Sequence, residues 1–432
     1  MKALEQFKVG IAQNRAGRGG VAVSVCSAQP DVLRALFRAA KAYRTFALIE
    51  STPNQVAPQG GYTGLTPADF AQRVKRIAQD EDFPLANILL GGDHLGTGTW
   101  RHLPAAAALN QARQLVAAYT SAGYRKIHLD TGFVCRDDPS PLPEAEVAER
   151  CAELVQVAEA HAGDVPLLYV VGSEVPPPGG AQEDARPRIT PPERVAATLE
   201  VFQGAFQRRN LEAAWERVKG LVVQPGVEFG DREVCDFQGA PELSAAILNH
   251  PGMVYEAHST DFQTAESLRA LARDHFYILK VGPWLTYTLR EGLYLLELME
   301  KELDPPTPSR FRETLLQTMK ADSRHWKTHY RGLAQAIEFK LNFSNLDRAR
   351  YYLERKEVMA AWQRLMHNLA PAPPEALISQ FMPRQYARIR SGQLTADPRE
   401  LLLDRIVQRL EGYMRAGQFA DSPAPAMTVK FG

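Results

Sequence analysis

The sequence predicts an α/β fold: a TIM (β/α)8 barrel followed by a C-terminal helical subdomain. Eight short apolar segments alternate with helical patterns over about 280 residues, and this count and length match the barrel. Most of these segments end in a polar or charged residue, as expected of strands around a barrel mouth. A doubly wound open sheet is the alternative, but it gives no reason for eight units. We therefore assign residues 1–303 to the barrel and 304–432 to the helical subdomain.

The first half of the barrel begins after a helical lead-in over residues 1–18. A proline suits the first turn of a helix, and Thr66-Pro67-Ala68-Asp69 has the order of a capping box. The expected strands are Gly20–Ser27, Phe46–Glu50, a third that starts at Ile88 and ends at Gly91, and Lys126–Asp130. The expected helices run from Pro30 to about Tyr43, from Thr66 onward, from about Pro104 to Ala122 and from about Glu144 to His161.

The second half repeats the alternation, and the strand pattern then stops at Asp304-Pro305-Pro306. The expected strands are Pro166–Gly172, Leu221–Gln224, Met253–Ala257 and Phe276–Lys280, with helices from about Pro192 to Arg209 and from about Pro283 toward Leu303. Beyond the prolines, periodic segments predict helices over Phe311–Arg331, Glu357–Asn368 and Pro398–Arg415.

Composition excludes several classes of protein. The 50 Lys and Arg residues balance 50 Asp and Glu, which leaves no overall field to attract nucleic acid or an anionic membrane. The four cysteines form no CxxC pair, so we expect reduced thiols and a cytoplasmic location. Charged residues precede any apolar run, so no signal peptide is expected. No apolar stretch approaches the roughly 20 residues that span a bilayer.

The charge is distributed unevenly along the chain. From residue 302 onward there are 20 Lys and Arg against 14 Asp and Glu. This excess suits a phosphorylated ligand contacted from the C-terminal part, whereas a solvated basic face is the simpler interpretation.

The candidate site is built around Gly91-Gly92-Asp93-His94, where a buried strand presents an acid beside an imidazole. Because catalytic groups lie at the C-terminal ends of barrel strands, we expect this pair to meet residues from the other strand ends. His94 and His258 are predicted to hold a divalent cation, Zn²⁺ or Mn²⁺, with help from Glu174 or Gln224. The predicted catalytic carboxylates are Asp93, Asp130 and Glu174, with Asp93 and Asp130 exchanging a substrate proton on opposite faces.

Other interpretations exist for each of these residues. Asp93 and His94 could make ordinary loop hydrogen bonds, and a buried, hydrogen-bonded side chain is the favoured interpretation of His128. Lys280 could form an imine with a ketose, contact a phosphate or pair with a strand-end acid. A bound metal already supplies an electron sink, so we expect a polar contact. Gly282 follows in the sequence, where its backbone N–H could approach a phosphate.

Several long segments resemble those of the GatZ/KbaZ family, the so-called non-catalytic subunit of class II tagatose-1,6-bisphosphate aldolase. They include LIESTPNQVAPQGGYTGLTPADF (48–70), ILLGGDHLG (88–96), KIHLDTG (126–132), GSEVPPPGGA (172–181), EAHSTDFQT (256–264), ILKVGP (278–283) and RARYYL (348–353). The resemblance implies a TIM barrel, ketohexose phosphates as the substrate class and a class II aldolase catalytic subunit as a partner. In the first segment, Glu50, Asn54 and Gln55 are expected to bind the substrate or its phosphate, together with Lys280 and Gly282.

Two functional hypotheses follow from the residues and the resemblance. Similar proteins are described as 4-epimerases of fructose and tagatose, free or 6-phosphorylated. In such an enzyme the C3–C4 bond breaks in retro-aldol fashion, and re-addition to the other face of the aldehyde inverts C4. In the second hypothesis, the protein stabilises a separate aldolase chain and its own barrel mouth is inactive. Relatives were also named tagatose 6-phosphate kinase, but the sequence has no GxxxxGK[ST] loop. A homo-oligomer is expected.

Overall fold

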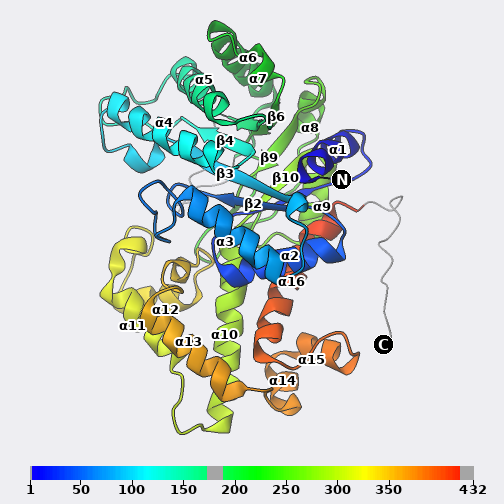
Figure 1. Ribbon diagram of the computed structural model, residues 1–432, viewed down its shortest axis with the longest axis vertical. Coiled ribbons are helices and arrows are strands. Elements are labelled where there is room, and N and C mark those ends of the chain that lie inside the picture. Colours follow the sequence, from blue (N-terminus) through cyan, green and yellow to red (C-terminus); the bar gives the residue numbers. More distant parts are fainter. Residues whose placement is uncertain (1, 173–187, 419–432) are drawn as a thin grey trace.

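The computed structural model describes residues 2–172 and 188–418 and centres on a closed barrel of eight parallel strands (Figure 1). Neighbouring strands follow the order β1-β10-β9-β6-β5-β4-β3-β2, and helices surround them, which confirms the predicted TIM barrel. The barrel strands are β1 (Ala22–Val25), β2 (Ala47–Ser51), β3 (Ile88–Gly96), β4 (Lys126–Asp130), β5 (Leu168–Val171), β6 (Val218–Val222), β9 (Val254–Ala257) and β10 (Phe276–Val281). The short strands β7 (Glu228–Phe229) and β8 (Val234–Cys235) form a separate antiparallel pair.

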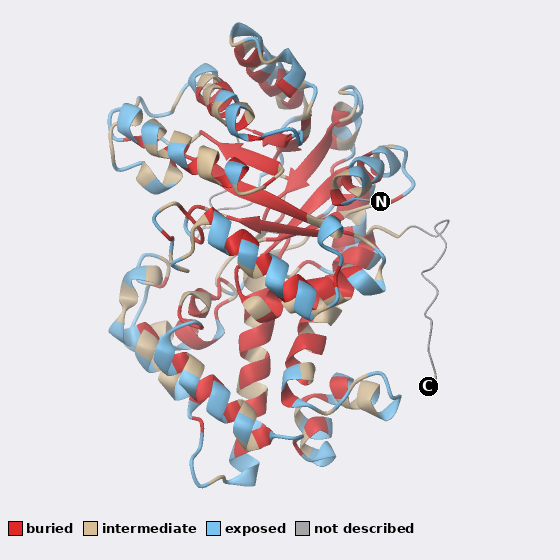
Figure 2. Ribbon diagram, in the orientation of Figure 1, coloured by how far each residue is buried: buried red, intermediate tan, exposed pale blue. Residues whose placement is uncertain are grey.

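Helices follow the strands around the outside of the barrel and turn their apolar faces inward (Figure 2). The capping box predicted at Thr66 is present, because Thr66 and Asp69 bond each other's backbone N–H at the start of α3. The helices of the barrel part are α1 (Ala3–Arg15), α2 (Pro30–Ala42), α3 (Pro67–Asp80), α4 (Ala105–Ser121), α5 (Glu144–His161), α6 (Pro192–Arg208), α7 (Glu212–Trp215), α8 (Pro241–Leu248), α9 (Ala265–Arg273) and α10 (Pro283–Leu303), with the short 3-10 turns η1 (Leu85–Asn87) and η2 (Gly98–Trp100).

The barrel interior is apolar at the N-terminal ends of the strands. Helix α1 packs there, with the ring of Phe7 5.2 Å from that of Tyr277 and 6.0 Å from that of Phe46. The same buried cluster includes Leu48, Leu89, Val170, Val254 and Ile278. Because this end is filled with side chains, the opposite mouth is left for polar groups and a ligand.

Two predicted strand boundaries are wrong. The third strand does not end at Gly91, because β3 continues through Gly96 and pairs there with Asp130 of β4. Gly96 allows this pairing, since a Cβ at that position would lie 1.8 Å from the Asp130 carbonyl oxygen. The sixth strand covers Val218–Val222 rather than Leu221–Gln224, in register with its neighbours β5 and β9.

The C-terminal part is helical, as predicted, but it does not lie apart from the barrel. Helix α16 runs beside α10 and returns to the barrel against α2 (Figure 1). Two ion pairs join α2 to α16. They link Arg38 to Glu400 at 2.6 Å and Asp31 to Arg399 at 2.7 Å. The elements are α11 (Phe311–Ala321), η3 (Ser323–His325), α12 (Ala334–Phe343), η4 (Arg348–Tyr351), α13 (Lys356–Leu369), α14 (Glu375–Phe381), α15 (Pro383–Arg390) and α16 (Pro398–Ala416).

The helix predicted over Phe311–Arg331 is shorter in the structure. Helix α11 ends at Ala321, and the side chain of Asp322 then accepts the backbone N–H of Arg324 and begins the turn η3. Within residues 2–172 and 188–418, no helix combines the length and the apolar character needed to cross a membrane.

Candidate active site

The upper half of the barrel interior holds five charged side chains that are almost fully buried. The ammonium nitrogen of Lys126 lies 2.5 Å from Glu50 and 2.6 Å from Glu256. The ammonium nitrogen of Lys280 lies 2.9 Å from Glu50 and 3.3 Å from Glu256, and it also forms an ion pair with Asp93. Two cations therefore face three carboxylates. Gly91 makes room for this network, since a Cβ there would lie 2.7 Å from Glu50 Cγ.

Mutual attraction favours the charged forms of Lys280 and Asp93 despite their burial. Burial lowers the pKa of Lys280, but the three neighbouring carboxylates raise it, and the result is a pKa well above the ordinary value. For Asp93, burial raises the pKa, whereas His94, Lys280 and His128 bring it well below the ordinary value. Lys280 is therefore an ammonium and Asp93 a carboxylate at neutral pH.

Strand β3 departs from regular geometry at the Asp-His pair. Its register against β4 shifts between Gly92 and Leu95, and His94 has a left-handed backbone with φ of 51°. Consecutive side chains of a regular strand point to opposite faces, but this bulge lets both Asp93 and His94 line the cavity at the barrel mouth. A left-handed non-glycine residue costs of order 1 kcal/mol, and such strain is concentrated at functional sites.

Three histidines meet at this point, and each one is hydrogen-bonded to a carboxylate. The pairs are His94 Nδ1 with Asp130 Oδ2 at 2.8 Å, His128 Nδ1 with Asp93 Oδ1 at 2.9 Å, and His258 Nε2 with Glu256 Oε1 at 3.0 Å. A carboxylate oxygen accepts a hydrogen bond from a ring N–H, so His94 Nδ1 and His258 Nε2 are the donors in their pairs. His128 Nδ1 lies within hydrogen-bond distance of two groups, because the backbone N–H of His94 also donates to it at 3.2 Å. The Nδ1 atom of His258 therefore keeps its lone pair, because the low pKa of this residue leaves the ring neutral.

The donor set fits a divalent cation. One atom from each histidine and from Asp93 lies within 4.8 Å of all the others. His128 Nε2 is buried and has no hydrogen-bond partner in the described part of the chain, which is costly unless a ligand contacts this atom. Imidazoles oriented by carboxylates are common ligands of divalent metals in proteins.

The protonation of the histidines also suits this role. Burial lowers the pKa of His258 well below the ordinary value and Lys280 lowers it further, so this imidazole is neutral. Burial lowers the pKa of His94 as well, but Asp93 and Asp130 raise it above the ordinary value. Protons therefore compete with a cation for His94, and cation affinity falls as the pH is lowered.

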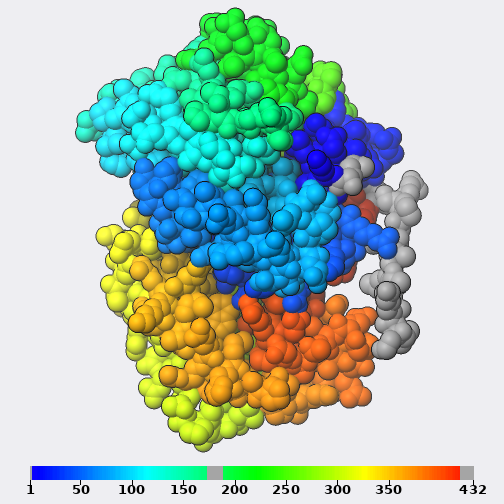
Figure 3. Space-filling view, viewed as in Figure 1, coloured from blue at the N-terminus to red at the C-terminus, as the bar shows by residue number. Residues whose placement is uncertain are grey.

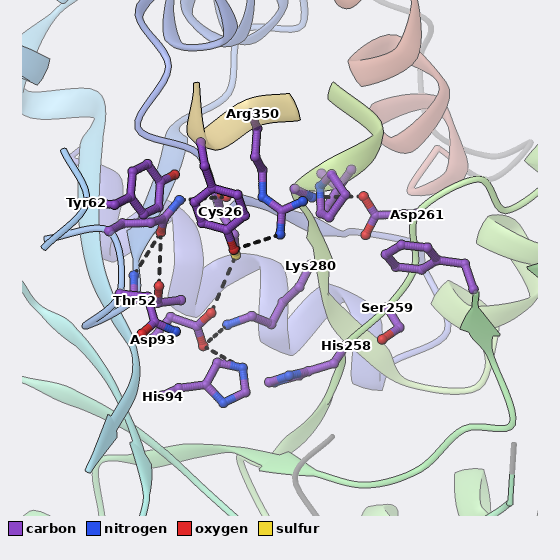
Figure 4. Close-up of a pocket in the computed structure, with 17 residues that line it drawn as sticks. Cys26, Thr52, Tyr62, Asp93, His94, His258, Ser259, Asp261, Lys280 and Arg350 are labelled. Atoms are coloured by element: carbon purple, nitrogen blue, oxygen red, sulfur yellow. Dashed lines mark hydrogen bonds and ion pairs between the residues drawn. The ribbon is translucent and has the colours of Figure 1, made fainter. Parts of the chain in front are cut away.

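A cavity opens above this cluster and gives a ligand access to it. Figure 4 shows the side chains of Asp93, His94, His258 and Lys280 gathered at one side of the cavity, with Arg350 reaching toward it from η4. The lining also includes Cys26, Thr52, Asn54, Gln55, Tyr62, Ser259, Asp261, Gly282 and Tyr351.

The predicted substrate residues have different surroundings. Asn54 and Gln55 line the cavity, whereas Glu50 lies below it between the two lysines. The N–H of Gly282 does not face an open anion site, because it donates to Asp261 Oδ1 at 3.1 Å, as does the N–H of Trp284 at 2.7 Å. Burial raises the pKa of Asp261 to about 6.

Two of the other predicted residues, Asp130 and Gln224, do not line the described cavity. Asp130 lies behind His94 and is absent from the described lining of the cavity. Gln224 follows β6 and is half-buried, and its backbone exchanges two hydrogen bonds with Thr190, each 2.9 Å long. Glu174 falls outside the described residues.

Several residues of the site were not selected from the sequence. Glu256 and Lys126 complete the ion network, and His128 completes the group of histidines. A signal was present in the alternation of strand side chains, which puts residue 128 on the face of 130 and residue 256 on the face of 258. Arg350 and Tyr351 come from the C-terminal part, where no strand pattern points toward the barrel.

Lys280 is expected to form no imine. Imine formation needs a neutral amine, and this ammonium is held by three carboxylates with its pKa raised well above the ordinary value. Borohydride treatment in the presence of fructose 6-phosphate should leave the mass of the protein unchanged, as measured by intact mass spectrometry. A stable hexose adduct mapped to Lys280 by peptide analysis would contradict this prediction.

Comparisons with known proteins identify the family. A probable tagatose 6-phosphate kinase from Sinorhizobium meliloti is 41% identical, with a TM-score of 0.86 over 92% of this chain and 100% of that chain. The fructose-bisphosphate aldolase of Campylobacter jejuni is 13% identical, with a TM-score of 0.45 over 85% of this chain and 92% of that one. Residues 7–418 match the family described as D-tagatose-1,6-bisphosphate aldolase subunit GatZ/KbaZ-like. The chain therefore belongs to the GatZ/KbaZ-like family.

Proposed function

We propose that this chain is itself an enzyme, which inverts C4 of a ketohexose or ketohexose 6-phosphate and so interconverts the fructose and tagatose series. The observation that carries the proposal is that an ionised Asp93 lines the cavity together with His94 and His258 and is bonded to the buried His128. A binding scaffold gains nothing from this strained and highly charged arrangement, whereas a reaction that moves protons next to a cation needs it.

Asp93 is the candidate base for the C4 hydroxyl. Its Oδ1 atom is occupied by Lys280 and His128, while the described contact of Oδ2 is Cys26 Sγ at 3.7 Å. Oδ2 is thus the freer oxygen to accept the hydroxyl proton as the C3–C4 bond breaks. The same carboxyl group returns the proton after the aldehyde half has turned and the bond has re-formed, which leaves C4 inverted.

The histidines would hold a divalent cation, Zn²⁺ or Mn²⁺, through His94, His128 and His258. When bound, this cation supplies Lewis acidity to the C2 carbonyl of the ketose. Asp130 receives the Nδ1–H of His94 and thereby fixes the orientation of that ring. We therefore assign Asp130 a positioning role and leave the proton transfer to Asp93. Lys280 holds Asp93 in its ionised state.

The second candidate function is an accessory role. The family description as an aldolase subunit favours it, because it implies a class II aldolase catalytic chain as the partner. In that case the cavity binds a ligand without converting it.

The test is an assay of the purified chain alone. We expect conversion of fructose 6-phosphate or fructose to the corresponding tagatose product when Zn²⁺ or Mn²⁺ is present, and loss of this conversion after treatment with a chelator. If metal-loaded protein converts no ketohexose or ketohexose phosphate but raises the activity of a class II tagatose-bisphosphate aldolase, the accessory role is correct.

A further inference from the structure

Two arginines at the barrel mouth lack an acidic partner. Arg348 and Arg350 belong to η4, and neither forms an ion pair with a carboxylate in residues 2–172 and 188–418. Arg348 is only 5% exposed, and its Nε atom has no hydrogen-bond partner in the same residues. A buried cation is normally paired, because desolvation of an isolated charge is costly.

The groups around these arginines satisfy their hydrogen bonds without neutralising them. Arg348 donates to the Tyr351 hydroxyl at 3.1 Å and to His329 Nδ1 at 2.7 Å. Arg350 donates to the same hydroxyl at 3.2 Å and to backbone carbonyl groups, including that of Asp347 at 3.0 Å. Burial and the two nearby guanidinium groups lower the pKa of His329 to about 4, so His329 is a neutral acceptor.

The acids in the neighbourhood are engaged elsewhere. The Asp347 carboxylate accepts from Arg290 at 2.7 Å and from Thr286 at 2.6 Å, which fixes η4 against α10. Glu354 pairs with Arg73 at 3.0 Å. Asp322 pairs with Arg324 at 2.8 Å and with Arg355 at 2.9 Å. Two positive charges therefore remain for a ligand, on a turn that is already held in place.

The position of Arg350 connects this pair to the candidate active site. Arg350 lines the cavity that contains Asp93, His94 and His258 (Figure 4). It also lines an adjoining cavity of about 1220 Å³ that includes Arg348 and His329. The start of α10 offers no competing anion site, because Asp261 already occupies the N–H groups of Gly282 and Trp284.

We propose that Arg348 and Arg350 bind the phosphate of a phosphorylated ketohexose whose carbonyl end lies against the three histidines. Two guanidinium groups match the charge of a phosphate monoester, which is close to −2 at neutral pH, better than they match a single carboxylate. The inference rests on the proposed function for the identity of the sugar. It selects the 6-phosphate over the free sugar as the substrate.

The test measures binding to the full-length chain by calorimetry, separately from turnover. The probes are fructose 6-phosphate, inorganic phosphate, fructose and glucuronate. We expect the wild type to bind fructose 6-phosphate at least about 10-fold more tightly than fructose or glucuronate, and to bind inorganic phosphate at the same site in competition with it. Arg350→Gln and Arg348→Gln should each weaken the binding of fructose 6-phosphate about 10- to 100-fold, the usual loss for a charged hydrogen bond.

Arg324→Gln is the matched control. Arg324 lines the same adjoining cavity, but it is already paired with Asp322 and its side chain is 70% exposed, so its removal should leave binding unchanged. Arg348→Lys, which retains the charge, guards against a folding defect at the buried position and should retain part of the affinity.

The outcomes separate this inference from the proposed function. Wild-type binding of glucuronate as tight as that of fructose 6-phosphate, or an equal loss in Arg324→Gln and Arg350→Gln, would overturn the phosphate site. Phosphate binding that depends on Arg348 and Arg350 in a protein without turnover would refute the epimerase and leave the phosphate site intact.

Discussion

Asp93→Asn should lower the turnover of the ketohexose at least about 100-fold while the protein remains folded. Asparagine has the shape of aspartate and still accepts a hydrogen bond from His128, but it cannot take a proton from the C4 hydroxyl. Lys280 keeps Glu50 and Glu256 as partners, so the ion network survives the change. Steady-state kinetics with fructose 6-phosphate measure the loss, and circular dichroism checks the fold.

Asp130→Asn is the matched control, because Asp130 is also a buried carboxylate that bonds one of these histidines, His94. Loss of the carboxylate behind a ligating histidine typically weakens metal affinity about 10- to 100-fold. Turnover of Asp130→Asn should therefore be low at limiting metal and recover at saturating metal, whereas that of Asp93→Asn should not recover. Recovery of Asp93→Asn by added metal would show that Asp93 acts through the metal site and is not the base.

Much of the fold could be predicted because parallel barrels repeat a local pattern. Each apolar strand is followed by an amphipathic helix, and these patterns depend only on neighbouring residues. The end of β3 could not be predicted in this way. Gly91 and Gly92 usually mark a strand end, but here they make room for buried side chains, and pairing with β4 carries the strand on to Gly96. The return of α16 to α2 is likewise a long-range contact that local periodicity does not encode.

The candidate site was partly predictable for the same reason. Asp93, His94, His258 and Lys280 meet because the C-terminal ends of parallel strands surround one mouth. The bulge at His94 was not predictable, since it follows from the register between β3 and β4. The place of Arg350 in the site could not be predicted either, because η4 comes from a distant part of the chain. Its traces in the sequence were the excess of basic residues after residue 302 and the segment RARYYL (348–353), which carries part of the family resemblance.

Removal of any of the three histidines should abolish stoichiometric metal binding. We expect His94→Ala, His128→Ala and His258→Ala each to weaken the affinity for Zn²⁺ or Mn²⁺ by more than about 100-fold, since loss of an outer carboxylate alone costs up to that amount. Elemental analysis after dialysis against a metal buffer measures the bound metal without reference to activity. Circular dichroism and the thermal midpoint show whether each variant is folded.

Gln224→Ala distinguishes the ligand set that we propose from the set expected from the sequence. Gln224 lies after β6 and its backbone bonds Thr190, whereas His128 belongs to the group formed with His94 and His258, and its Nε2 has no hydrogen-bond partner among the described residues. Gln224→Ala should therefore bind a full equivalent of metal, and His128→Ala should not. The opposite result would return His128 to the role of a buried hydrogen-bonded side chain and assign the third ligand to Gln224.

Metal retention should also fall as the pH is lowered, because the raised pKa of His94 lets protons compete with the cation for this ring before the other two.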